Sequence, residues 1–330
     1  MGLNIGWSLG SRCPFSCLHC YTRDDRSGVR DLELEDVGRV IEFARANDVS
    51  HVTLGGNEPW FSGSGRSLLP AIVESLSEAC ISASLVTSGP SALRLASARP
   101  DLMALLVNVA ISLDAPRVSE HNKSRGAALW SLAMEALSAS STETRRPLIL
   151  WVLKADSTAE DVAQFADLAR DVGAYLRINL LKPNSPGLEP LFPDAERIQT
   201  VMDAAATHFR TVLSTDALLD PAATQRASCP CGDTTFRIGF KQADGSIPVH
   251  ACQYHRPHAP PGATVAAGSN VLEQLRVDPI AESNRTTPGC GTLRDLVGAT
   301  AAGGGGAEIE VPEQLRVWLN YLPTWIGSPR

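Results

Sequence analysis

The sequence of 330 residues lacks three features that would place it on a nucleic acid or in a membrane. It has no long basic run, and its formal net charge of −7 argues against a dedicated nucleic-acid surface. No apolar run reaches the roughly 18 residues of a membrane-spanning helix. The N-terminus has no basic segment followed by an apolar one, as a secretory signal would. These absences predict a cytoplasmic protein that binds neither nucleic acid nor membrane.

The remaining composition is that of an ordinary globular protein, with 44% hydrophobic and 20% charged residues. The length suits one large domain plus an appendage. Eight cysteines are present. Because disulfides are rare in the cytoplasm, these cysteines predict metal binding or redox chemistry instead.

Three of the cysteines lie close together near the start, in the segment Cys13-Pro14-Phe15-Ser16-Cys17-Leu18-His19-Cys20-Tyr21. Their thiolates suit an iron–sulfur cluster or zinc. Zinc would need a fourth ligand, usually from a second pair of cysteines or histidines. Three cysteines alone would leave one iron of a four-iron cluster open to another ligand. A zinc loop, with His19 as a possible fourth ligand, and a chance grouping remain the alternatives.

The C-x₃-C-x₂-C spacing, closed by an aromatic residue, resembles the motif of the radical S-adenosylmethionine (radical SAM) superfamily. The resemblance implies that Cys13, Cys17 and Cys20 hold a 4Fe-4S cluster whose open iron binds SAM. The reduced cluster would cleave SAM to a 5′-deoxyadenosyl radical, which takes a hydrogen atom from the substrate. Tyr21 would pack by the adenine or the cluster, and His19 would only pack nearby.

Strand-like and helix-like patterns alternate over the first two thirds of the chain. The expected strands cover residues 3–9, 50–54, 82–87, 105–113, 148–153 and 175–181, and the expected helices cover 33–47, 68–79, 92–98, 127–138, 158–172 and 195–209. This order predicts an α/β fold with parallel strands. The resemblance implies a partial (β/α)₆ barrel with its site at the carboxyl ends of the strands. Cys80, placed in an apolar helix, is expected to be a small buried hydrophobe.

Further polar segments follow the expected strands, and the resemblance implies that they bind SAM. The segment Gly55-Gly56-Asn57-Glu58-Pro59 corresponds to the family's Gly-Gly-Glu-Pro, from which the inserted Asn57 departs. Glycine lets the backbone approach a ligand closely. The other expected SAM contacts are Ser88, Ser112, Asp114 and Arg125, the last because a guanidinium suits a carboxylate. Taken alone, these residues could equally be ordinary turn or solvated surface residues.

The last third of the chain holds the cysteines Cys229, Cys231, Cys252 and Cys290. Residues 236–240 and 247–250 predict a β-hairpin across the Asp244-Gly245 turn. A cysteine, a hairpin and a further cysteine resemble the opening of SPASM and twitch extensions, which hold auxiliary 4Fe-4S clusters. Because the C-x₂-C-x₅-C run of a full SPASM extension is missing, we expect at most one auxiliary cluster. Its ligands would be Cys231, Cys252 and Cys290.

Cys229 could be the fourth ligand of the auxiliary cluster, a free thiol, or a hydrogen-atom donor to a substrate radical. A structural zinc site is the alternative for the whole group. We expect three parts: a radical SAM partial barrel (1–213), an auxiliary iron–sulfur region (214–295) and a tail that packs on the barrel (296–330).

The motifs define a reaction type and leave the substrate open. Related enzymes with such extensions modify ribosomally made precursor peptides, or act on polar small molecules such as aminoglycosides or sugars. We expect a precursor peptide first, a small natural product second, and a non-catalytic iron–sulfur or zinc scaffold third. The electron donor would be a reductant such as flavodoxin or ferredoxin. Because the first expected strand begins at Leu3, we expect no leader-peptide recognition domain before it.

Overall fold

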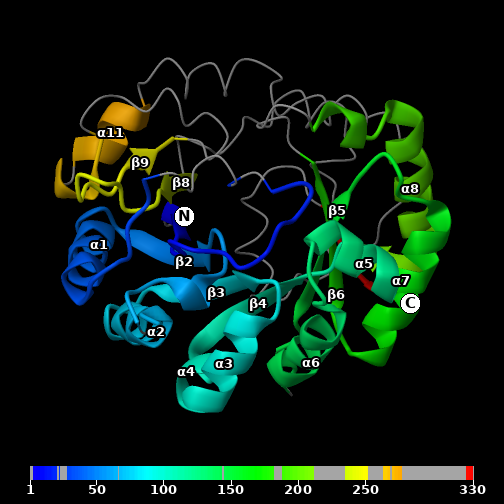
Figure 1. Ribbon diagram of the computed structural model, residues 1–330, viewed down its shortest axis with the longest axis horizontal. Coiled ribbons are helices and arrows are strands. Elements are labelled where there is room, and N and C mark those ends of the chain that lie inside the picture. Colours follow the sequence, from blue (N-terminus) through cyan, green and yellow to red (C-terminus); the bar gives the residue numbers. More distant parts are fainter. Residues whose placement is uncertain are drawn as a thin grey trace.

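The computed structural model describes residues 3–20, 22, 28–65, 67–142, 145–181, 188–211, 235–251, 263–267, 270–276 and 325–329. Within these ranges, one sheet has the strand order β7-β10-β6-β5-β4-β3-β2-β1-β8-β9. The sheet is strongly curved, and the helices lie along its outer side (Figure 1). The expected α/β fold, a partial barrel, is confirmed.

The barrel is built from six parallel strands: β1 (Leu3–Ser8), β2 (Val49–Gly55), β3 (Ser82–Thr87), β4 (Leu106–Ser112), β5 (Leu148–Leu153) and β6 (Tyr175–Leu180). The helices between and after them are α1 (Leu34–Ala46), α2 (Leu69–Glu78), α3 (Pro90–Ala98), α4 (Pro100–Leu105), α5 (Val118–Arg125), α6 (Trp130–Ser140), α7 (Ala159–Asp171) and α8 (Ala195–His208). Short 3-10 turns η2 (Pro59–Phe61) and η3 (Glu189–Leu191) follow β2 and β6. The strands β3 and β5 have the predicted bounds, and the other predicted elements differ at their ends.

The two sides of β1 differ in chemistry, and this difference fixes which side faces the helices. Ile5 and Trp7 of β1 belong to the hydrophobic core, together with helix residues such as Val40 and Ile72. Successive side chains of a strand point to opposite faces. Asn4 and Ser8 therefore face the inside of the curve, where they are buried polar residues. The outer side of β1 is thus the packing face, and its inner side carries polar residues.

Two later segments extend the sheet beyond these six strands. The strand β8 (Thr235–Ile238) pairs parallel with β1 and antiparallel with β9 (Val249–His250), which confirms the predicted hairpin. Its pairing with β1 was not predicted. Beyond β8, Lys241 Nζ lies 2.7 Å from Asp36 Oδ2 of α1, which fastens the hairpin to the barrel.

At the other edge, β10 (Trp325–Pro329) pairs antiparallel with β6 and with β7 (Phe209–Thr211). The remaining described elements are η5 (Val265–Ala267) and α11 (Asn270–Arg276). The expected domain boundaries, at 213/214 and 295/296, lie outside the described residues, so the three-part division stays a prediction. No helix in the described ranges has the length and apolar character to cross a membrane.

Candidate cluster and cofactor site

The cysteine loop follows β1 and lies at the carboxyl ends of the strands, as predicted. Two backbone hydrogen bonds tie its start to the end of β2, from Leu9 N to Gly55 O (2.9 Å) and from Gly10 N to Gly56 O (3.3 Å). Its middle is held by the end of α5, because Leu18 N donates to Ser124 O at 2.9 Å. Two elements far apart in the sequence therefore shape the loop.

The three cysteines of the motif come together in the structure. Cys17 is buried in a small apolar cluster with Phe15 and Leu129, and Cys13 and Cys20 pack against the same cluster. Burial raises the pKa of the Cys17 thiol, and the charge of Arg125 partly offsets this rise. Among the described residues, no three Cys, His, Asp or Glu side chains converge as ligands of one metal ion would. The thiolates of a four-iron cluster bind separate irons, so they lie farther apart than the ligands of one ion.

A buried ion pair lies beside the cysteines. Arg125, at the end of α5, places Nη2 2.5 Å from Asp114 Oδ1 and Nη1 3.8 Å from Cys17 Sγ. Ser124 Oγ donates to Asp114 Oδ2 at 2.8 Å, and Arg125 Nη1 lies 3.5 Å from Ser88 Oγ. Burial would raise the pKa of Asp114, but the positive charge of Arg125, the two neighbouring histidines and the hydrogen bond from Ser124 together outweigh it and lower the pKa to about 2. The structure thus brings three expected SAM contacts, Ser88, Asp114 and Arg125, into one network.

Two histidines complete the surroundings of this pair. His19 Nε2 lies 3.6 Å from Asp114 Oδ1, and His121 Nδ1 accepts a hydrogen bond from Asp114 N at 3.1 Å. Burial lowers the pKa of each imidazole to about 4. Both are therefore neutral at pH 7. That His19 packs near a bound cluster stays a prediction.

The chemistry of this region fits an iron–sulfur cluster together with a bound small molecule that carries amino and carboxylate groups. Three soft sulfur ligands lie on one loop. Beside them, Arg125 Nε, His19 Nδ1 and His121 Nε2 are buried and have no hydrogen-bond partner. A buried polar atom without a partner costs about 1–3 kcal/mol. A polar ligand that reached one of these atoms would remove its cost.

The segment after β2 connects three strand ends. Glu58 is fully buried, and its carboxylate accepts hydrogen bonds from the Thr87 hydroxyl, the Ser88 backbone N (3.0 Å), and both the backbone N (3.0 Å) and hydroxyl of Ser91. Gly56 has φ +74°, and a Cβ there would lie 2.8 Å from Ser8 Oγ. Glu58 thus fixes the end of β3 against the end of β2, and Gly56 lets β1 and β2 approach closely.

Some expected site residues make no described contact in this network. Ser112 is buried at the end of β4, close in sequence to Asp114. Tyr21, Cys229, Cys231, Cys252 and Cys290 lie outside the described residues, so their roles stay predictions.

The sequence reasoning missed four residues of the site: Thr22, Ser91, His121 and Ser124. His121 and Ser124 precede Arg125 within one helical turn, so an expected helix over 118–125 would have revealed them.

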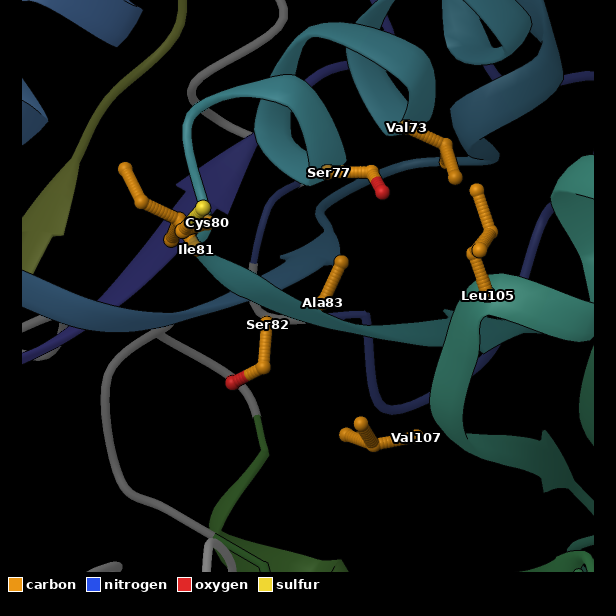
Figure 2. Close-up of a pocket in the computed structure, with 8 residues that line it drawn as sticks. All are labelled: Val73, Ser77, Cys80, Ile81, Ser82, Ala83, Leu105 and Val107. Carbon is orange, nitrogen blue, oxygen red and sulfur yellow. The ribbon is translucent and has the colours of Figure 1, made fainter.

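A separate cavity lies at the opposite, amino-terminal ends of β3 and β4. Its volume is about 250 Å³, and residues such as Val73, Ile81 and Val107 line it (Figure 2). Cys80 is also in its wall, but the prediction that this cysteine is a buried helix residue is wrong. It is exposed, with φ +58°, because α2 has already ended at Glu78 and the chain turns into β3. This cavity is remote from the cysteine loop.

Comparison with known proteins agrees with this geometry. The family model for the radical SAM superfamily matches residues 7–180. The mycofactocin maturase MftC of Mycolicibacterium smegmatis is 26% identical over 221 residues, which cover 64% of this chain and 54% of that protein. The MftC of Mycobacterium ulcerans is 25% identical over 221 residues, covering 64% and 57%. The chain therefore spans about half the length of the curated relatives it matches.

Solved structures show the same fold. SuiB of Streptococcus suis, bound to the precursor peptide SuiA, has a TM-score of 0.61 at 13% identity and covers 87% of this chain and 67% of its own. The structure of anSMEcpe with AdoMet and the Cp18Cys peptide has a TM-score of 0.64 at 15% identity, covering 96% and 95%.

Proposed function

Because the chain belongs to the radical SAM superfamily, whose cofactors are a 4Fe-4S cluster and SAM, we propose that Cys13, Cys17 and Cys20 bind this cluster. The observation that carries the proposal is the grouping of the three cysteines in one apolar cluster beside the buried Arg125. When bound, the reduced cluster and SAM supply a 5′-deoxyadenosyl radical that takes a hydrogen atom from the substrate. The protein is then a radical SAM enzyme.

The residues around the loop have separable tasks in this proposal. The backbone of Gly55 and Gly56, which lies beside the start of the cysteine loop, would meet the amino group of SAM. Arg125 faces the cysteines and keeps a positive charge there, which suits the SAM carboxylate. Asp114 and Ser124 orient Arg125, and the neutral His19 fills the space beside it without adding charge. Asn57, Ser88 and Ser112 remain proposed SAM contacts, as does Tyr21.

We propose a ribosomally made precursor peptide as the substrate, modified by crosslinking, oxidation or epimerisation. The support comes from MftC, a maturase by name, and from SuiB and anSMEcpe, whose structures contain peptides. The electron donor is a small reductant such as flavodoxin or ferredoxin, and the compartment is the cytoplasm. A second 4Fe-4S cluster, bound by Cys231, Cys252 and Cys290 with Cys229 as fourth ligand or hydrogen donor, completes the proposal.

The test is anaerobic incubation of the reconstituted protein with dithionite, SAM and each candidate precursor peptide. We expect 5′-deoxyadenosine and a mass change in the peptide, both lost in Cys17→Ala. Sugar aminotransferase genes next to this gene, together with turnover of an aminoglycoside and no turnover of the peptide, would change the proposed substrate from a peptide to a small molecule. Absence of 5′-deoxyadenosine with every candidate substrate would overturn the enzyme assignment.

A further inference from the structure

Asn57, the residue by which the chain departs from the family's Gly-Gly-Glu-Pro pattern, bridges the two ends of the cysteine loop. Its backbone has φ +52°, a left-handed conformation that asparagine tolerates better than most residues. Its Nδ2 donates to Gly10 O at 2.5 Å, and its Oδ1 accepts from Thr22 Oγ1 at 3.0 Å. Gly10 precedes the three cysteines and Thr22 follows them. One side-chain amide therefore joins the start of the loop to its end.

Thr22 connects this amide to the last cysteine of the motif. Its side chain is buried, and Oγ1 lies 3.3 Å from Cys20 Sγ. A threonine hydroxyl has a single proton to donate. In a free thiol, the S–H can donate to Oγ1 while the O–H donates to Asn57. An iron-bound sulfur has no proton, so the Thr22 hydroxyl becomes the only donor between the two atoms. Its single proton is then shared between Cys20 Sγ and Asn57 Oδ1 in a three-centre hydrogen bond.

We propose that Thr22 donates a hydrogen bond to the cluster sulfur of Cys20, and that Asn57 positions both Thr22 and the loop for this contact. The proposal rests on the cluster ligation proposed above. Hydrogen bonds to cluster sulfurs change the reduction potential, because they stabilise the additional negative charge of the reduced state. Thr22 thus makes the cluster easier to reduce. Both residues act through Cys20 and are positioning residues.

The test of Thr22 is a redox titration, followed by EPR, of the reconstituted native protein, Thr22→Val and Thr22→Ser. Valine keeps the shape and removes the hydroxyl, whereas serine keeps the hydroxyl. At a fixed potential we expect the ratio of reduced to oxidised cluster to fall about tenfold in Thr22→Val, which is about 59 mV for a one-electron couple. Iron content stays native, and Thr22→Ser restores the ratio. A Thr22→Val ratio equal to the native one overturns the tuning role.

The test of Asn57 is the rate at which a chelator removes iron from the reconstituted protein. Asn57→Gly preserves the left-handed backbone but removes the bridge, so we expect faster iron loss than from native protein. Asn47→Gly is the matched control, because Asn47 ends α1 and its Nδ2 donates to Phe43 O at 2.8 Å, a contact outside the cysteine loop. Equal rates for Asn57→Gly and Asn47→Gly overturn the bridging role.

These outcomes are distinct from failure of the cluster assignment itself. Suppose the native protein binds iron through the three cysteines, but Thr22→Val leaves the reduction potential unchanged and Asn57→Gly leaves the iron-loss rate unchanged. That result contradicts only the positioning roles. A native protein that binds no cluster contradicts both proposals.

Discussion

The ion pair of Arg125 and Asp114 is the strongest electrostatic feature at the cysteine loop. Both side chains are buried, and Nη2 and Oδ1 are 2.5 Å apart. A buried pair contributes modestly to net stability, but removal of one partner leaves the other charge uncompensated. The pair therefore fixes the loop's surroundings more than it stabilises the whole fold.

Arg125→Met is expected to lower the free energy of unfolding by about 3–5 kcal/mol, because Asp114 then keeps a buried charge without its partner. Urea unfolding at pH 7 measures the change. The double variant Arg125→Met/Asp114→Asn should recover part of the loss. Arg99→Met, which breaks an exposed pair with Asp101, should leave stability nearly unchanged. Equal losses for Arg125→Met and Arg99→Met would contradict the account of the pair.

The buried His51 of β2 predicts how the free energy of unfolding depends on pH. It is buried between Ser82 Oγ (2.8 Å) and Thr53 Oγ1 (3.4 Å), and burial lowers its pKa from 6.5 to about 3. The folded state therefore resists protonation while the unfolded state accepts it below pH 6.5. Stability is expected to be full above pH 6.5 and to fall as the pH drops toward 3, by at most about 1.4 kcal/mol per pH unit from this group.

Urea unfolding of native protein and His51→Asn at several values between pH 7 and pH 5 measures this contribution. The variant should lose less stability per pH unit than the native protein, because one buried imidazole is gone. Parallel pH profiles for the two proteins would show that His51 takes no part in the acid sensitivity.

The helix α5 shows why part of the site could not be read from the sequence. Its buried residues are His121, Ser124 and Arg125, so it lacks the apolar periodicity that predicts a helix. It contacts the cysteine loop, through Ser124 O and Arg125. The six barrel strands were predictable because their outer residues are apolar and the flanking helices are amphipathic. The pairings of β8 with β1 and of β10 with β6 join residues far apart in the chain, which local patterns do not encode.

At the site, the three cysteines and the segment around Gly55 and Gly56 were predictable from their spacing. The tasks of individual side chains were not. Glu58 was expected to contact SAM, which stays a prediction, and its structural task of accepting hydrogen bonds from Thr87, Ser88 and Ser91 was not foreseen. Asn57 was seen only as a departure from the family pattern, whereas its side chain joins the two ends of the loop. Such roles depend on which strand ends meet in space.

Gly126, which ends α5, tests how closely this helix must approach the loop. It has φ +64°, and a Cβ there would lie 2.8 Å from Ser16 O of the cysteine loop. Gly173 ends α7 with φ +65°, and a Cβ there would meet nothing within 4 Å. Gly173→Ala should cost about 1–2 kcal/mol from the left-handed backbone alone. Gly126→Ala should cost about 1–3 kcal/mol more, because the loop must shift.

Thermal unfolding of the two glycine variants, with iron content after reconstitution, checks this difference. We expect Gly126→Ala to retain less iron than Gly173→Ala, since the displaced loop carries the cysteines. Matching stability and iron content in the two variants would mean that α5 does not set the position of the loop.

The whole molecule is a curved sheet whose carboxyl edge bears the cysteine loop and whose edges are extended by β8, β9 and β10 (Figure 1). The proposed auxiliary cysteines follow β7 or flank the β8–β9 hairpin in the sequence. Anaerobic reconstitution should therefore give about eight irons per chain, as for two 4Fe-4S clusters. Cys231→Ala should reduce the count to about four while the SAM-binding cluster remains. Four irons in the native protein would contradict the proposed second cluster. One zinc in addition to four irons would indicate a structural zinc site in its place.

The most direct measurement of the central claim is the EPR spectrum of the reconstituted, dithionite-reduced protein before and after addition of SAM. If Cys13, Cys17 and Cys20 hold a cluster with an open iron, the spectrum changes when SAM binds, and Cys17→Ala abolishes this change. A spectrum that SAM does not alter, or a SAM-dependent change that survives in Cys17→Ala, would contradict the assignment.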